Sequence, residues 1–180
     1  MKEVYVFFVT GFEEIEGLGT VDILRRGGIN TKTVSLTGDK IVVGSHEIPV
    51  VTDLLFEDVD FGKAELLVLP GGTVKYNDHE GVKSEILDFF KKGEKVAAIC
   101  ASPMVLGGLG ILEGRKAVSY PGFEGYLKGA QFVDQPVVVD GNVTTGKGPG
   151  LTFDFALKLV EIIAGKEKSD EVAKGLLLKK

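Results

Sequence analysis

Nearly unbroken runs of apolar residues mark the main strands of this chain. The clearest are residues 4–9, 64–69 and 96–99, in which Val, Leu, Ile, Ala and Phe dominate. A strand with one face in water alternates apolar and polar residues, whereas a strand buried on both faces of a parallel sheet is a continuous apolar run. The pattern therefore predicts a central sheet that is covered on both sides.

Segments with helical spacing separate these strands. The first helix is expected from the turn at residue 11 to about residue 26, and its inner face is expected to carry Ile15, Leu18, Val21 and Leu24. Further helices are expected at 78–92, directly after Cys100, at 151–164 and at 169–174. Further strands are expected at 30–36, 41–43, 47–51, 116–120, 131–133, 137–139 and 143–145. Because strand and helix alternate, we expect one α/β domain, residues 1–180, built as a doubly wound sandwich with a mainly parallel sheet and helices on both faces.

Charge and cysteine content narrow the classes of function. The 180 residues include 26 acids and 21 bases, giving a net charge of −5, which argues against a nucleic-acid partner. A single cysteine excludes an intrachain disulfide and fits a reducing compartment, so a cytoplasmic location is expected. The apolar N-terminal run is too short to span a bilayer and enters a turn at residues 10–11, so a strand is expected there and no membrane partner.

Cys100 follows one of the apolar strands and precedes a helix. Small residues, Ala98 and Ser102, stand two positions to either side of it. This is the pattern of a nucleophile elbow, in which small neighbours allow a sharp turn that exposes one side chain at the end of a strand. Ser102 is expected to cap the helix, and the helix N-terminus is expected to favour the thiolate. A buried structural cysteine is the alternative interpretation.

Two other segments are expected to meet Cys100 at the carboxyl edge of the sheet, where doubly wound folds bind ligands. They are residues 10–16 and the pair Gly71-Gly72, whose bare N–H groups can approach a ligand. A carboxyl group near a thiolate tends to keep its proton, so Glu16 could donate to the sulfur or act as general acid and base. The sequence by itself barely separates Glu16 from the two glutamates before it, and a solvated glutamate is the alternative.

The sequence points to no metal and no cofactor. His79 begins a polar helix and is expected at the surface, while His46, at a hairpin tip, could reach Cys100 only by folding over or from a second subunit. Two histidines and one cysteine at wide spacing form no ligand pattern. The near match to a P-loop at residues 141–148 lacks the final Ser or Thr, and no G-x-G-x-x-G follows a strand.

Four motifs occur in one order: residues 11–16 (GFEEIE), 69–72 (LPGG), 97–103 (AAICASP) and 146–150 (GKGPG). Together, and through nearly the whole chain, they resemble the ThiJ/PfpI superfamily in the branch of the parkinsonism-associated protein deglycase. The resemblance implies a flavodoxin-like, class I glutamine amidotransferase-like sandwich. It also implies a protein that is usually a homodimer and carries a reactive cysteine on the elbow.

Carried over residue by residue, the resemblance implies that Cys100 is the nucleophile and that Glu16 is the acid hydrogen-bonded to it. Gly72 and Ala101 would supply backbone donors beside the sulfur, as in an oxyanion hole. Ala101 stands where the protease-like branch has a histidine, which counts against peptidase or amidase chemistry. Tyr120 stands where deglycase relatives often carry a histidine, and it either donates a hydrogen bond or packs as an aromatic ring.

The resemblance implies a small reactive-aldehyde substrate. The Cys100 thiolate would add to it, Glu16 would shuttle a proton, and water would release a 2-hydroxy acid. Repair of early glycation adducts is the related deglycase activity. Tyr120 and His46 are candidate substrate-side residues, because relatives present a basic residue near the position of His46 to the partner subunit's site. The alternative function is a redox sensor or stress-protective protein whose Cys100 is oxidised without turnover. An intracellular protease or amidase is a third hypothesis.

Overall fold

The computed structural model describes residues 2–178. Among these residues, the strands of the central sheet are β1 (Glu3–Phe8), β2 (Thr31–Ser35), β5 (Leu54–Leu55), β6 (Ala64–Leu69), β7 (Lys95–Ile99), β10 (Val137–Asp140) and β11 (Val143–Gly146). They lie in the order β10-β11-β7-β6-β1-β2-β5. Every pair is parallel except β10 with β11, which form an antiparallel hairpin. The predicted mainly parallel sheet is confirmed.

The strand order reverses beside β1. The chain passes from β1 to β2 on one side and later places β6 on the other side of β1. In doubly wound sheets, the loops at the carboxyl ends of strands that flank such a reversal part and leave a crevice. Here those loops are residues 9–13 and 70–72, and β7, paired with β6, ends beside them at Cys100. The strand order thus brings the three expected segments to one edge.

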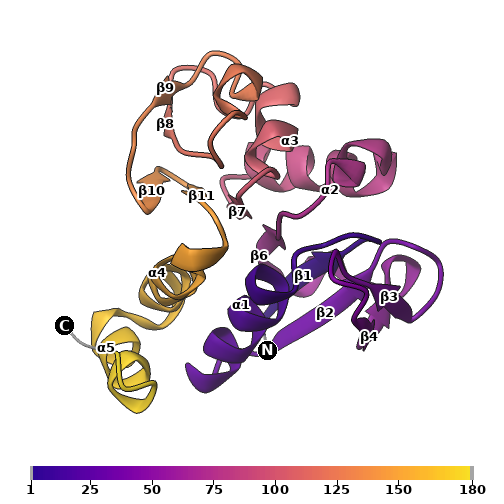
Figure 1. Cartoon of the computed structure of the whole chain (residues 1–180), viewed down its shortest axis with the longest axis vertical. Helices are drawn as coiled ribbons and strands as arrows, with labels where there is room; N and C mark the ends of the chain where they lie inside the picture. Colours follow the sequence, from indigo (N-terminus) through magenta and orange to yellow (C-terminus); the bar gives the residue numbers. More distant parts are fainter. Residues whose placement is uncertain (1, 179–180) are drawn as a thin grey trace.

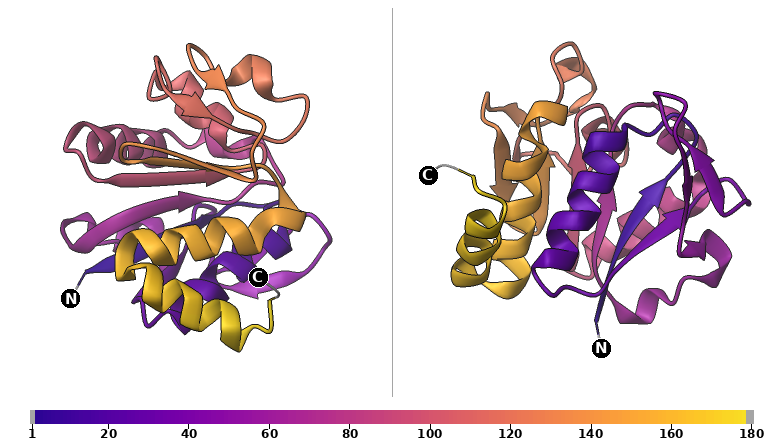
Figure 2. Two further views of the ribbon diagram at one scale, coloured as in Figure 1. Left: turned by 90° about the vertical axis from the view of Figure 1, so that its left-hand side faces the viewer. Right: turned by 60° about the horizontal axis from the view of Figure 1, so that its bottom comes forward.

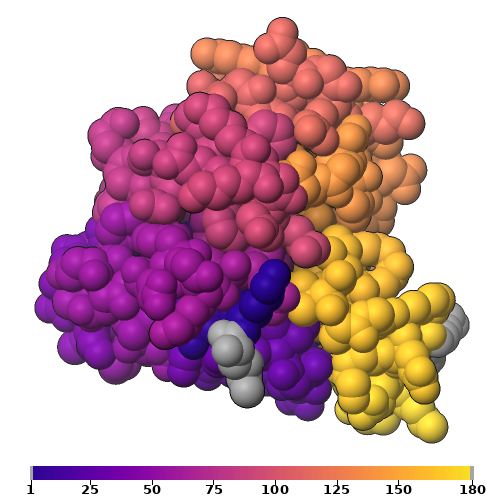
Figure 3. All heavy atoms as spheres, turned by 180° about the vertical axis from the view of Figure 1, so that it is seen from behind, coloured from indigo at the N-terminus to yellow at the C-terminus, as the bar shows by residue number. Residues whose placement is uncertain are grey.

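Helices cover both faces of the sheet. They are α1 (Glu14–Arg26), α2 (Glu80–Lys91), α3 (Pro103–Gly108), α4 (Thr152–Ala164) and α5 (Lys166–Gly175). α1 and α4 pack together on one face, and α2 and α3 lie on the other (Figure 1). α5 packs on the outer side of α4 (Figure 2). Seen from behind, the C-terminal helices form one side of the molecule, next to the start of β1 (Figure 3). The predicted three-layer arrangement is confirmed.

The inner face of α1 differs from the predicted one. The last two predicted positions are buried, but Ile15 and Leu18 are 55% and 37% exposed. The buried positions of the helix are Glu14, Glu16, Gly17, Thr20, Val21, Ile23 and Leu24. Gly17 makes a close approach to the core, because a Cβ there would lie 2.9 Å from the ring of Phe12. The apolar spacing misidentifies the inner face here, because a glycine and three polar residues, Glu14, Glu16 and Thr20, occupy buried positions of the helix.

Several elements outside the central strands are shorter or placed differently than expected. β3 (Ile41–Val43) and β4 (Pro49–Val51) form the predicted hairpin. β8 (Lys116–Ala117) and β9 (Gln131–Phe132) pair with each other outside the main sheet. β5 is only two residues long, which is too short for an apolar pattern to reveal. No helix within residues 2–178 combines the length and apolar character needed to cross a membrane.

Candidate functional site

Cys100 occupies the turn between β7 and α3 with a left-handed φ of +67°. Such a backbone conformation costs a non-glycine residue about 1–3 kcal/mol, so surrounding contacts must hold it. Its amide donates to the carbonyl of Gly146 at 2.9 Å, and its carbonyl accepts from the amide of Tyr120 at 2.8 Å. Cys100 is 8% exposed. The geometry is that of the predicted elbow, with the cysteine at the carboxyl edge of the sheet.

Ser102 does not cap α3, and this part of the sequence prediction is wrong. Its side chain makes no capping bond to the helix. The hydroxyl donates instead to the carbonyl of Pro70, in the loop that follows β6. Because Ser102 is 1% exposed, its hydroxyl needs a partner inside the protein, and the neighbouring loop supplies one. The bond ties the elbow to that loop.

Glu16 is completely buried and reaches the elbow from α1. Its Oε2 accepts a hydrogen bond from the amide of Gly71 at 2.7 Å, and its carboxyl group also interacts with the thiol of Cys100. Oε1 has no geometrically well-formed hydrogen bond among the described residues. A Cβ on Gly71 would lie 2.4 Å from Cβ of Cys100 and 2.6 Å from Oε2 of Glu16, so only glycine fits between them.

Two backbone amides face the sulfur of Cys100. The N–H groups of Gly72 and Ala101 hydrogen-bond to it and act to lower the thiol pKa. Gly72 has a φ of +91°, and a Cβ there would lie 2.3 Å from the amide nitrogen of Glu13. Both conformation and space therefore require glycine at this position. Donors placed in this way stabilise negative charge on the sulfur or on an oxygen bound near it.

The pKa values of Glu16 and Cys100 are both raised. Burial is the largest cause for Glu16, whose pKa rises to about 7. Burial is also the largest cause for Cys100, and the charge of Glu16 and its hydrogen bond add to it, so that the thiol pKa rises to about 12. The backbone amide of Ala101, at the start of the helix, lowers the thiol pKa as expected, but burial and Glu16 outweigh it, so the prediction that the resting site holds a thiolate is wrong. A carboxylate that titrates near neutrality beside a thiol is suited to general-base chemistry.

Tyr120 joins the site through its backbone. Its amide holds the carbonyl of Cys100, while its side chain lies against Gly148, where a Cβ would be 3.1 Å from the ring. Tyr120 is 45% exposed, and within residues 2–178 its hydroxyl has no hydrogen-bond partner. The ring contacts the backbone at Gly148 and the hydroxyl is left available, so both sequence interpretations stay predictions, as does a contact with substrate.

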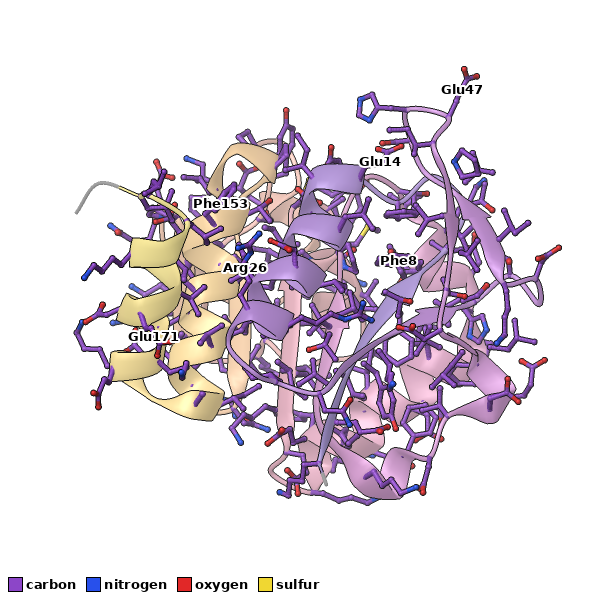
Figure 4. The ribbon with its side chains drawn as sticks, turned by 90° about the horizontal axis from the view of Figure 1, so that it is seen from below. Phe8, Glu14, Arg26, Glu47, Phe153 and Glu171 are labelled. Carbon is purple, nitrogen blue, oxygen red and sulfur yellow. The ribbon has the colours of Figure 1, made fainter. Side chains whose placement is uncertain are left out.

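His46 lies on the hairpin tip, residues 44–47 between β3 and β4, and it contacts Glu14 of α1. Its Nδ1 is 2.7 Å from Oε2 of Glu14, and its amide donates to Oε1 at 2.7 Å. The hydroxyl of Ser45 donates to Oε2 at 3.0 Å. Burial acts to raise the pKa of Glu14, but these hydrogen bonds together outweigh it and bring the pKa to about 2. Figure 4 shows Glu14 at the start of α1, below the hairpin tip that carries Glu47.

A group that could hold a metal ion lies beside this contact. The candidate ligand atoms of Glu13, Glu14 and His46 are all within 4.8 Å of one another, which the sequence spacing did not reveal. However, Glu13 caps α1 by accepting from the amide of Glu16 at 2.7 Å, and both oxygens of Glu14 accept from the hairpin tip. A metal would have to replace these bonds. His79 caps α2 through Nδ1 and takes no part in the site.

Sequence reasoning misses two connections of the site. It predicts that Gly71 and Gly72 both present N–H groups to a ligand, whereas the amide of Gly71 donates a hydrogen bond to Glu16. It predicts that Ser102 caps α3, whereas the hydroxyl of Ser102 donates a hydrogen bond to the carbonyl of Pro70. A serine in place of the glycine usual at this position of an elbow is the signal that could have drawn attention to Ser102.

The chain is similar to known proteins in both sequence and structure. A model of the DJ-1/PfpI family matches residues 2–162. The chain is 39% identical over 183 residues to Protein dj-1beta of Drosophila melanogaster, covering 98% of this chain and 97% of that protein. It is 33% identical over 173 residues to a Caenorhabditis elegans protein named Glutathione-independent glyoxalase DJR-1.2, covering 93% and 91%. The solved structure of oxidized Toxoplasma gondii DJ-1 matches with a TM-score of 0.95, 32% identity and complete coverage of both chains.

Proposed function

The chain belongs to the DJ-1/PfpI family, and we propose that it converts small 2-oxoaldehydes to 2-hydroxy acids through Cys100 and Glu16. The observation that carries this proposal is a buried carboxyl group, with a pKa of about 7, against the thiol on a strained elbow. The relative named as a glutathione-independent glyoxalase supports the same chemistry.

In the first step, the sulfur of Cys100 attacks the aldehyde carbon and a C–S bond forms. Glu16 takes the thiol proton during the attack, so a free thiolate does not have to accumulate at a group whose pKa is about 12. The amides of Gly72 and Ala101 stabilise the negative charge that develops on the aldehyde oxygen. That oxygen then receives the proton, and the product is a hemithioacetal.

In the second step, a proton moves between the two carbons of the substrate. Glu16, again a carboxylate, removes the proton from the carbon bound to sulfur, and an enediolate forms. Return of that proton to the neighbouring carbon, with transfer of the hydroxyl proton from the oxygen beside sulfur to the other oxygen, gives the thioester of a 2-hydroxy acid. Water then breaks the C–S bond, releasing the acid and the thiol of Cys100. The net change is the addition of water to the oxoaldehyde, so atoms and electrons balance without an external oxidant.

Lactate formation from methylglyoxal, without added glutathione, tests the proposal. The wild type is expected to produce lactate, and Cys100→Ser is expected to lose this activity because serine is a far weaker nucleophile in the same position. Ser169→Ala, which removes a buried hydroxyl between α4 and α5, is the control that should retain it. Unchanged turnover in Cys100→Ser would overturn the proposal.

A second candidate function is oxidation of Cys100 by hydrogen peroxide. The hydrogen-bond donors around the sulfur favour this reaction because they can stabilise the oxidised forms. One peroxide would convert the thiol to sulfenic acid and water, and a second would give sulfinic acid. The amides of Gly72 and Ala101, with protonated Glu16, would donate to the new oxygens. The relative whose structure is described as oxidized supports this candidate.

Peroxide titration with intact-mass measurement tests the second function. The wild type is expected to gain the mass of two oxygens, and Cys100→Ser is expected to gain none at the same dose. No gain in the wild type at stoichiometric peroxide would contradict it. Deglycase activity, a homodimer, and a cytoplasmic location stay predictions, and sedimentation velocity checks the homodimer.

A further inference from the structure

The peptide group between Pro70 and Gly71 is held at both ends. Its carbonyl accepts from the hydroxyl of Ser102, and its N–H donates to Oε2 of Glu16 at 2.7 Å. The next carbonyl, that of Gly71, accepts from the amide of Glu13 at 2.9 Å. A single peptide plane therefore connects a side chain of the elbow to the carboxyl group that faces Cys100.

We propose that Ser102 is a positioning residue for the Cys100–Glu16 pair. Its hydroxyl fixes the Pro70–Gly71 peptide so that the amide of Gly71 points at Glu16 and the amide of Gly72 points at the sulfur. Ser102 acts through this peptide, to which its hydroxyl is bonded, and takes no part in the proton transfer itself. The inference rests on the proposed function only where it treats Glu16 as the general base.

The position of Ser102 suits this role. It is two residues from Cys100 in the elbow and 1% exposed, and its hydroxyl turns away from the helix that it could have capped. The glycine after Pro70 lies between Cys100 and Glu16 with no room for a side chain, so the peptide that Ser102 contacts lies directly against both groups. A hydroxyl that orders a loop in such tight contact controls where the amides of that loop point.

The expected consequence of losing this hydroxyl follows from the charges around Glu16. The titratable groups that face it are the thiol of Cys100, the carboxyl of Glu13 and the buried hydroxyl of Tyr76. The amide of Gly71 lowers the pKa of Glu16 against burial, the largest influence, which raises it to about 7. A loosened peptide weakens that amide bond, so the pKa of Glu16 rises further in Ser102→Ala.

The test is the rate of Cys100 alkylation by iodoacetamide as a function of pH. The rate depends on how the thiol and Glu16 share their proton, so the ionisation of Glu16 gives the lower inflection of the profile. In Ser102→Ala this inflection is expected to move up by about one pH unit, the effect of weakening one hydrogen bond to a charged group. Ser102→Thr keeps a hydroxyl and is expected to restore the wild-type profile.

Two controls separate positioning from a general loss of structure. Ser169→Ala removes the same kind of bond, a buried hydroxyl that donates to the carbonyl of Leu157, far from the elbow, and should leave the profile unchanged. In a Glu16→Gln background, Ser102→Ala should produce no shift, because the group through which Ser102 acts no longer titrates. Ser102→Gly provides the same test if Ser102→Ala does not fold.

A wild-type profile in folded Ser102→Ala would overturn the inference, as would a shift that persists in the Glu16→Gln background. Alkylation requires only a folded protein with a free thiol. The result is therefore independent of whether methylglyoxal is turned over, and failure of the proposed function would be seen separately in the lactate assay.

Discussion

Glu14 and Glu16 lie two residues apart at the start of α1, and both are buried, at 6% and 0% exposure. Their pKa values nevertheless move in opposite directions, to about 2 for Glu14 and to about 7 for Glu16. Glu14 faces the hairpin tip, where the hydroxyl of Ser45 and two groups of His46 hydrogen-bond to it. Glu16 faces the elbow, where one amide and a thiol meet its carboxyl group.

Burial does not by itself make a carboxyl group a proton carrier. Burial raises the pKa of both glutamates, and hydrogen-bond donors lower it. The two glutamates differ in how many such donors they have. With several donors, Glu14 stays ionised and fastens the hairpin to α1. With fewer hydrogen-bond donors around its carboxyl group, Glu16 titrates near neutrality and can exchange a proton with Cys100. Neighbouring groups whose surroundings push their pKa values apart are typical of sites where one acts in catalysis.

The largest expected effect is on turnover, and it tests this division of roles. Glu16→Gln is expected to lower lactate formation from methylglyoxal by about 100-fold or more, because it removes a general base. Glu14→Gln, the same substitution two residues earlier, is expected to change it by no more than about 3-fold, since it leaves the base in place. Equal losses of turnover in the two variants would contradict the assignment of Glu16 as the general base.

The next effect is on stability, because Glu16→Gln is expected to increase the free energy of unfolding. The folded protein keeps the Glu16 proton up to a pKa of about 7, whereas the unfolded chain releases it near the ordinary value of 4.5. The free energy of unfolding therefore falls as pH rises between these values. Removing the charge should raise it by about 3 kcal/mol above pH 7, with little change below pH 4.5.

Urea unfolding of the wild type and Glu16→Gln at several pH values measures this difference. The gain should grow through the interval in which Glu16 ionises and then stay constant. A variant that is less stable than the wild type at about pH 8 would mean that the carboxylate is better satisfied than its contacts indicate.

The sequence predicts the sheet and the elbow well, for a physical reason. Continuous apolar runs have few alternatives to buried parallel strands, and the strand order then brings their carboxyl ends together. The orientation of α1 is less predictable, because Gly17 and not an apolar side chain makes the close approach to Phe12. The two-residue strand β5 has too few residues for any pattern to emerge.

The choice between glutamates could not be made from local sequence. Glu13, Glu14 and Glu16 all follow the same strand, yet the first caps the helix, the second contacts the hairpin and the third meets the thiol. What separates them is the approach of residues 44–47 and 70–72, which are distant in the chain. The resemblance to a known family singled out Glu16, and spacing alone did not.

A smaller effect is expected when the hairpin contact is weakened. The pKa of Glu14 lies below its ordinary value of 4.5, so its contribution to stability is present above pH 4.5 and is lost as pH falls toward 2. Glu14→Gln should cost about 1–2 kcal/mol at neutral pH, less than the full shift would give, because solvent screens the outer side of the hairpin tip. Equal urea stability of the variant and the wild type at neutral pH would show that the charge contributes nothing.

The smallest effect is expected from His46→Ala. The ring of His46 is 68% exposed, whereas the backbone amide of residue 46 and the hydroxyl of Ser45 both remain to hold Glu14 in the variant. The hydrogen bond to Glu14 raises the pKa of His46, so the contribution of the ring is fully present below pH 6.5 and is lost as pH rises through the raised value. Thermal unfolding should therefore show a small fall in Tm at about pH 6 and none at about pH 9. A large fall at the higher pH would mean that the ring packs against Glu14 regardless of charge, and the contrast between the two glutamates would then rest on packing as much as on hydrogen bonds.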